Sequence, residues 1–120
     1  MTSLEKAKAI VKVLDEKKGR DIKLIEIKGL STLGDYFVLA SGGSNTQVKA
    51  LADDVDEEMH KQFDIHPDRV EGMQNAEWVL MDYDDVMVHI FQEEPRQFYA
   101  LERLWNDAPQ VDISDLLIKD

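Results

Sequence analysis

The chain has 120 residues, of which 43% are hydrophobic and 32% charged, so we expect one domain with a single compact core. It contains no cysteine, which excludes disulfides, thiolate metal sites and cysteine nucleophiles and indicates a reducing compartment, the cytoplasm. No apolar run approaches the length of a membrane span, and the first residues lack the apolar segment of a signal peptide. We therefore expect no membrane association and no export.

The net charge of -11 is distributed unevenly along the chain. Residues 61–120 carry 5 basic and 14 acidic side chains, whereas residues 1–60 carry 9 and 11. Proteins bind nucleic acid through clustered Lys and Arg, so direct nucleic-acid binding is not expected as the main contact. A basic protein partner fits better, because complementary potentials steer association. The alternative, that the acidity serves solubility alone, stays open.

The first residues predict a helix. Thr2 and Glu5 have the spacing of a capping box, apolar residues then recur at helical intervals, and Gly19 supplies a stop. Several lysines fall on or just after this helix without interleaved aromatic residues, so we expect them to lie on a solvated face. They are Lys6, Lys8, Lys12, Lys17 and Lys18.

The middle of the chain predicts two strands and a second helix. Residues 22–28 alternate as a strand should, and the nearly continuous apolar run at 35–40 predicts a strand buried on both faces. A helix with one apolar stripe is expected over 45–63. Residues 65–72 contain a proline and predict a connection or a short edge strand.

Residues 78–92 predict a β-hairpin, because two runs of β-branched and aromatic residues flank the Asp84-Asp85 turn. Pairing Tyr83 with Val86 divides the side chains between two faces. The first face is apolar and should belong to the core: Val79, Met81, Tyr83, Val86, Val88 and Ile90. The second hairpin face mixes aromatic and polar side chains and is the candidate binding surface: Trp78, Leu80, Asp82, Met87, His89 and Phe91.

The chain closes with a predicted helix over 93–105, which has Pro95 in its first turn, and an acidic C-terminal tail over 109–120 that docks or frays. Residues 1–108 would then form the domain. The order of elements predicts an α/β fold with a mixed β-sheet packed with helices.

The turn formed by Gly42, Gly43 and Ser44 allows two interpretations. A glycine-rich turn before a helix can bind phosphate, as in nucleotidyltransferases, where a following strand supplies two carboxylates for magnesium. Here the next acidic cluster, 53–58, lies on the helix itself. A turn capped by Ser44 or Asn45 is therefore favoured, and a divergent nucleotidyltransferase-like enzyme remains the alternative.

Metal sites find little support in the pattern. Asp82, Asp84 and Asp85 could offer oxygen ligands, but Asp is a common turn residue and a hairpin turn supplies few converging ligands. The three histidines show no shared metal-ligand spacing: His60, His66 and His89. We expect no metal, no cofactor and no catalytic residue.

Three separated blocks resemble the ribosomal silencing factor family, also called RsfS or Iojap-like. They are DYFVLASGGSNTQVKALAD at 35–53, EGMQNAEWVLMDYDDVMVHIF at 71–91 and FYALERLWNDA at 98–108. One departure is Asp84, which stands where the family's hairpin turn usually has Gly. Because Asp tolerates a left-handed backbone, the turn should still form.

The resemblance implies a non-enzymatic domain with a topology similar to nucleotidyltransferases but without their catalytic carboxylates. It also implies binding of the large ribosomal subunit at ribosomal protein number fourteen. A domain bound there would block joining with the small subunit and repress translation under nutrient limitation. Members of the family are also often homodimers.

Carried onto this sequence, the resemblance assigns partner binding to the second hairpin face and its neighbours. Trp78 and Phe91 would supply anchoring apolar area, and Asp82 and Glu94 would meet Arg or Lys of the basic ribosomal protein. The neighbouring residues are Tyr83, Glu94 and Tyr99.

Overall fold

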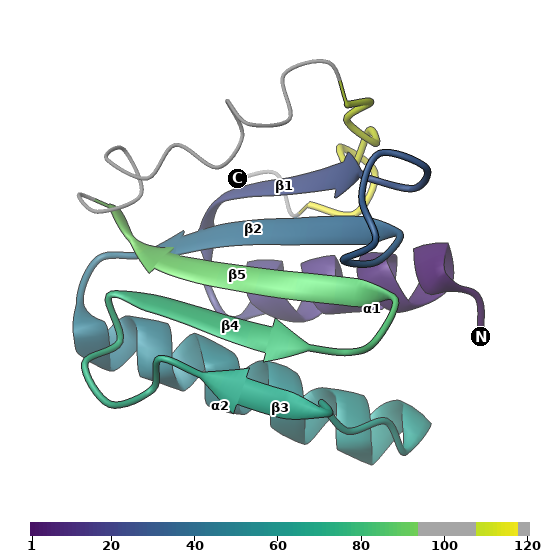
Figure 1. Ribbon diagram of the computed structural model, residues 1–120. Helices are drawn as coiled ribbons and strands as arrows, with labels where there is room; N and C mark the ends of the chain where they lie inside the picture. Colours follow the sequence, from purple (N-terminus) through teal and green to yellow (C-terminus); the bar gives the residue numbers. More distant parts are fainter. Residues whose placement is uncertain (94–107, 118–120) are drawn as a thin grey trace.

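A computed structural model describes residues 1–93 and 108–117 (Figure 1). Within these residues, two helices and five strands follow one another as α1 (Ser3–Glu16), β1 (Arg20–Glu26), β2 (Tyr36–Gly42), α2 (Asn45–Phe63), β3 (Arg69–Glu71), β4 (Trp78–Asp82) and β5 (Val86–Gln92). Among the described residues, neither helix has the length and apolar character that crossing a bilayer requires.

The five strands form one sheet in the order β1-β2-β5-β4-β3. The β2 and β5 strands pair in parallel, and the other three neighbouring pairs are antiparallel. Both helices lie on one side of this sheet (Figure 1). The predicted α/β fold with a mixed, helix-packed sheet is confirmed, and β3 occupies the edge position expected within 65–72.

The capping box predicted at the start of α1 is present. The Glu5 N–H donates to the Thr2 hydroxyl at 3.1 Å, and the Thr2 N–H donates to the Glu5 carboxylate at 2.9 Å. The Thr2 backbone bond lowers the pKa of the Glu5 carboxyl. After the helix ends at Glu16, the Gly19 N–H donates to the Leu14 carbonyl at 2.7 Å.

The main core lies between the helices and the sheet. It is built from the buried stripes of both helices and from the first hairpin face, as predicted. All seven residues of β2 are buried, which confirms the expectation of a strand covered on both faces. Helix α2 matches the predicted 45–63 range residue for residue.

Strand β1 begins two residues before the predicted 22–28 range. Its pairing with β2 shifts between Arg20 and Lys23, where Asp21 has a left-handed φ of 48°. A bulge of this kind breaks the simple alternation on which the prediction depended.

The C-terminal tail docks along the outer edge of β1, as the yellow segment in Figure 1 shows. The Glu26 N–H donates to the Pro109 carbonyl and the Val111 N–H to the Leu24 carbonyl, both at 2.8 Å. Ile113 is buried in the main core. The division into a domain at 1–108 and a tail at 109–120 stays a prediction, and the helix predicted over 93–105 lies outside the described residues beyond Glu93.

Candidate protein-binding site

The hairpin has the predicted register, since the Tyr83 N–H donates to the Val86 carbonyl at 2.9 Å. Asp84 adopts the left-handed conformation expected of it, with φ 73°. Strand β5 lies in the sheet between β2 and β4, whereas among the described residues β4 is flanked on its far side only by the three-residue β3. This difference between the two strands decides how much of the second hairpin face reaches solvent.

The β5 half of the second hairpin face is buried, contrary to the prediction of an exposed working surface. Met87 and His89 are each 6% exposed, and Phe91 is fully buried. The physical reason is the central position of β5, because the large side chains of its neighbours crowd the same face. Met87 and Phe91 belong to a second core cluster, which side chains of β1, of β2 and of two flanking positions complete: Ile25, Ile27, Phe37, Leu39, Met87, Phe91 and Ala108.

The β4 half is only half-buried. Trp78 and Leu80 pack against the second core cluster and stay partly exposed. Asp82 follows them on the same face, and its side chain is 20% exposed. Of the six predicted residues, these three therefore keep some exposure to solvent.

Trp78 is held in place by a hydrogen bond and by ring contacts. Its indole Nε1–H donates to His89 Nδ1 at 3.0 Å, which assigns the imidazole proton to Nε2. The Phe91 ring stacks on the indole with centroids 5.2 Å apart. Burial lowers the pKa of His89 to about 4, so the imidazole is neutral at pH 7.

An ion-pair network continues the accessible surface from β4 onto β3. Arg69 lies opposite Asp82 and Glu71 opposite Leu80. Arg69 Nε is 3.2 Å from Asp82 Oδ2, and Arg69 Nη1 is 3.3 Å from Glu71 Oε1. We call Trp78, Leu80, Asp82, Arg69 and Glu71 the β3–β4 outer surface.

Arg69 and Glu71 are not among the binding residues predicted from the sequence. The polar-apolar-polar alternation of Arg69-Val70-Glu71 was the available signal, because it puts both charges on one side of any strand. Their place opposite Leu80 and Asp82 depends on pairing across the intervening loop, which alternation does not specify.

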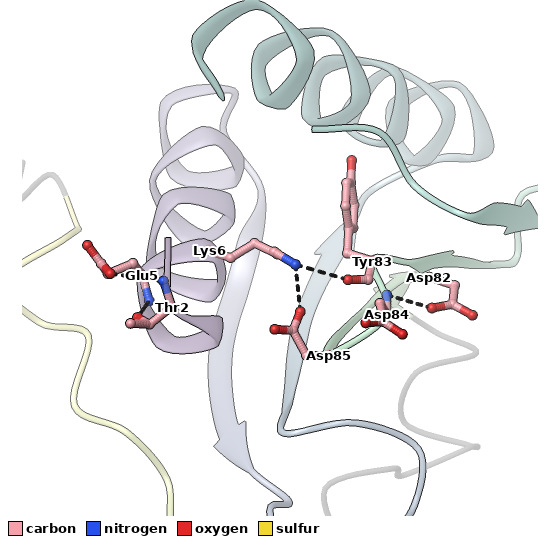
Figure 2. Close-up of polar contacts among 7 residues, drawn as sticks. All are labelled: Thr2, Glu5, Lys6, Asp82, Tyr83, Asp84 and Asp85. Carbon is pink, nitrogen blue, oxygen red and sulfur yellow. Dashed lines mark hydrogen bonds and ion pairs between the residues drawn. The ribbon is translucent and has the colours of Figure 1, made fainter. Parts of the chain in front are cut away.

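Tyr83 does not belong to the outer surface, although it was assigned as a neighbour. It is 2% exposed, and its ring points toward α2 (Figure 2). Strand alternation puts it on the helix side with Met81, and burial raises the pKa of its hydroxyl. Glu94 and Tyr99, the other two assigned neighbours, lie outside the described residues.

The turn aspartates are engaged within the chain (Figure 2). Lys6 of α1 donates to Asp85 Oδ1 at 2.6 Å and to the Tyr83 carbonyl at 3.2 Å. The Asp84 N–H donates to Asp82 Oδ1 at 2.8 Å. The prediction of a solvated Lys6 is wrong, because this side chain bridges the helix and the hairpin turn and is 16% exposed.

The glycine-rich turn before α2 has the structure of a helix cap. The Gln47 N–H donates to the Ser44 hydroxyl at 3.1 Å, and the Gly43 N–H donates to the Gln47 side chain at 2.6 Å. The Arg20 guanidinium lies against Gly43. Because the chain's own side chains use these donors, the geometry favours the cap over a phosphate loop.

A family profile described as "Ribosomal silencing factor during starvation" matches residues 1–120. The chain belongs to the ribosomal silencing factor family. The family member RsfS of Halalkalibacterium halodurans is 36% identical over 117 residues, which span 98% of this chain and 99% of that protein. RsfS of Bacillus subtilis is 37% identical over 110 residues, or 88% and 92% of the two chains.

The fold of this chain also agrees with a solved structure of similar sequence. A crystal structure of a Chromobacterium violaceum protein superimposes with a TM-score of 0.84 at 35% identity, covering 88% of each chain. The family resemblance of the three sequence blocks is thereby confirmed, together with the α/β fold that it implied.

Proposed function

We propose that this ribosomal silencing factor binds the large ribosomal subunit at ribosomal protein number fourteen, through its β3–β4 outer surface. Bound there, it blocks joining with the small subunit and represses translation under nutrient limitation. It does so in the cytoplasm and without catalysis. The observation that carries the proposal is a partly exposed Trp78 and Leu80 beside the carboxylates of Asp82 and Glu71, on a chain that belongs to this family.

Trp78 and Leu80 supply the apolar part of this surface. A few residues, most often Trp, Tyr and Arg, carry most of the binding energy of protein interfaces, so Trp78 is the expected anchor and Leu80 adds apolar area beside it. The Trp78 indole is already fixed by His89 and Phe91, so little rotamer freedom remains to be lost on binding. In this proposal the buried Met87, His89 and Phe91 position the anchors and do not touch the partner.

The charged side chains of this surface would attract a basic partner and orient it during binding. Asp82 and Glu71 share one cation, Arg69, so the three side chains carry a net charge of -1 on a chain of -11. A basic partner can offer additional Arg or Lys to these two carboxylates. Affinity should fall as salt screens the attraction, since Arg69 and Glu71 are exposed.

To block joining of the small subunit, the bound chain needs only to occupy space at the contact surface. The chain measures 34 × 34 × 33 Å along its principal axes. A rigid body of this size on a surface where two subunits meet leaves no room for the second subunit. No chemical step is required, which is consistent with a glycine-rich turn used as a helix cap.

Cosedimentation with large subunits tests the proposal. Leu80→Arg and Asp82→Lys should each lower the affinity for large subunits at least tenfold, because each adds positive charge to a surface that faces a basic protein. The matched control is Asp53→Lys, a charge reversal at an exposed position of α2. Undiminished binding by both surface variants, with circular dichroism showing a folded protein, would exclude this site.

A homodimer is a separate proposal that rests on the family resemblance alone. Sedimentation equilibrium at several concentrations tests it. A single species with the mass of 13.8 kDa would refute it.

A further inference from the structure

Three metal-ligating side chains meet at the C-terminal end of α2. The ligand atoms of His60, Asp64 and His66 all lie within 4.8 Å of one another. His60 Nδ1 is 3.4 Å and His66 Nε2 is 3.9 Å from Asp64 Oδ1. The two imidazole rings have centroids 4.3 Å apart. The spacing of the histidines in the sequence does not indicate this cluster, because the chain reversal after the helix is what brings His60 and His66 together.

The backbone that carries His60 and Asp64 is fixed by a left-handed (αL) C-cap of the helix. The Asp64 N–H donates to the His60 carbonyl at 2.9 Å, and the Ile65 N–H donates to the Met59 carbonyl at 3.2 Å. Asp64 has the left-handed φ of 55° that this motif requires. The separation of these two ligand residues is therefore set by the fold.

His66 is held on its two sides. Ile65 before it packs against the main core, and Pro67 after it restricts the His66 backbone to extended conformations. The three ligand residues thus need only side-chain rotation to converge further. All three are exposed, so an ion can reach them from solvent without opening the fold.

We infer that His60, Asp64 and His66 bind a divalent transition-metal ion of the zinc class. Zn²⁺ ligands at 2.0 to 2.2 Å in tetrahedral geometry lie about 3.4 Å apart. The His60–Asp64 distance of 3.4 Å already has this value, and the His66–Asp64 distance of 3.9 Å exceeds it by about half an ångström. Two imidazoles and one carboxylate would leave one position for water.

The ligand chemistry selects the ion. Two imidazole nitrogens favour Zn²⁺, Ni²⁺ or Cu²⁺ over Mg²⁺ and Ca²⁺, which prefer oxygen ligands. The net charge of -11 raises the local concentration of any cation. The site is independent of the proposed ribosome binding, because none of its residues belongs to the β3–β4 outer surface.

Calorimetry with Zn²⁺ on the full chain, free of any affinity tag, tests this site. The expected result is one Zn²⁺ per chain, not displaced by a hundredfold excess of Mg²⁺. His60→Gln, His66→Gln and Asp64→Asn should each weaken Zn²⁺ binding at least tenfold. Asn is chosen at position 64 because it tolerates the left-handed backbone, so the helix end stays intact.

The matched control is Asp53→Asn, which removes an exposed carboxylate from the same helix and should leave Zn²⁺ affinity unchanged. In nuclear magnetic resonance spectra, Zn²⁺ should shift the imidazole signals of His60 and His66 but not those of the buried His89. Absence of Zn²⁺ binding, or equal affinity of all four variants and the parent protein, would overturn the inference.

Discussion

The two faces of the sheet are built from the same strands but are completed differently. On one face, α1 and α2 cover an apolar layer that continues across the four longer strands. On the other face, the described residues form a smaller apolar cluster around β1, β2 and β5, which gives way at β4 to Trp78, Leu80 and Asp82. On this second face the side chains of β5 are buried and those of the neighbouring β4 are partly exposed. Such an arrangement supports a binding surface on a rigid base.

The two faces should differ most in how far the free energy of unfolding falls when a large side chain is shortened to Ala. Ile90 is fully buried beneath the helices, so Ile90→Ala should lower the free energy of unfolding by roughly 2 to 5 kcal/mol. Leu80 is half-buried, so Leu80→Ala should lower the free energy of unfolding by about half as much or less. The reason is that this truncation removes fewer buried contacts and leaves a smaller cavity. Urea unfolding measures both. Equal losses of unfolding free energy would mean that Leu80 is buried as completely as Ile90.

Low pH should destabilise the folded chain through protonation of His89 on the second face. Its pKa is about 4 in the folded chain against an ordinary value of 6.5, so the unfolded state binds more protons between these pH values. The stabilising effect of the neutral imidazole is complete above pH 6.5 and is lost as the pH falls. The loss amounts to about 3 kcal/mol at pH 4.

Urea unfolding of His89→Gln across pH 4 to 7 isolates this effect from the titration of the many carboxylates. Gln keeps an acceptor for the Trp78 indole but does not titrate. The variant should therefore lack the additional acid loss, whereas the control His66→Gln, at an exposed position, should keep it. Parallel pH profiles for the parent and His89→Gln would show that His89 is not buried as a neutral group.

A smaller effect is expected where the helix side meets the hairpin turn. Lys6→Ala removes the bonds to Asp85 and to the Tyr83 carbonyl, and should lower the free energy of unfolding by about 1 to 2 kcal/mol. The control Lys12→Ala, at an exposed position of the same helix, should change it by less than about 0.5 kcal/mol. Equal effects of the two changes in thermal unfolding would show that the Lys6 bridge does not stabilise the turn.

Local patterns predicted the parts of this fold that depend on neighbours in sequence. The capping box at Thr2, the range of α2 and the Tyr83–Val86 register all follow from residues a few positions apart. The shared sheet face of Trp78, Leu80 and Asp82 followed too, because these residues alternate along one strand.

The remaining features depend on contacts distant in sequence. Burial of Met87 and His89 results from the parallel pairing of β5 with β2, and no alternation within the hairpin specifies which strand becomes central. The Lys6 bridge to Asp85 joins positions 79 residues apart. The convergence of His60 and His66 depends on a left-handed residue after the helix, which is a matter of backbone conformation and not of spacing.

Thiol footprinting tests the proposed binding surface most directly, because the chain has no cysteine of its own. Single-cysteine variants Leu80→Cys, on the β3–β4 outer surface, and Asp53→Cys, on α2, would be labelled with a maleimide in the presence and absence of large ribosomal subunits. The labelling rate at position 80 should fall at least tenfold when subunits are bound, while the rate at position 53 stays unchanged. Protection at position 53 with unchanged labelling at position 80 would contradict the proposal that this surface docks on the ribosome.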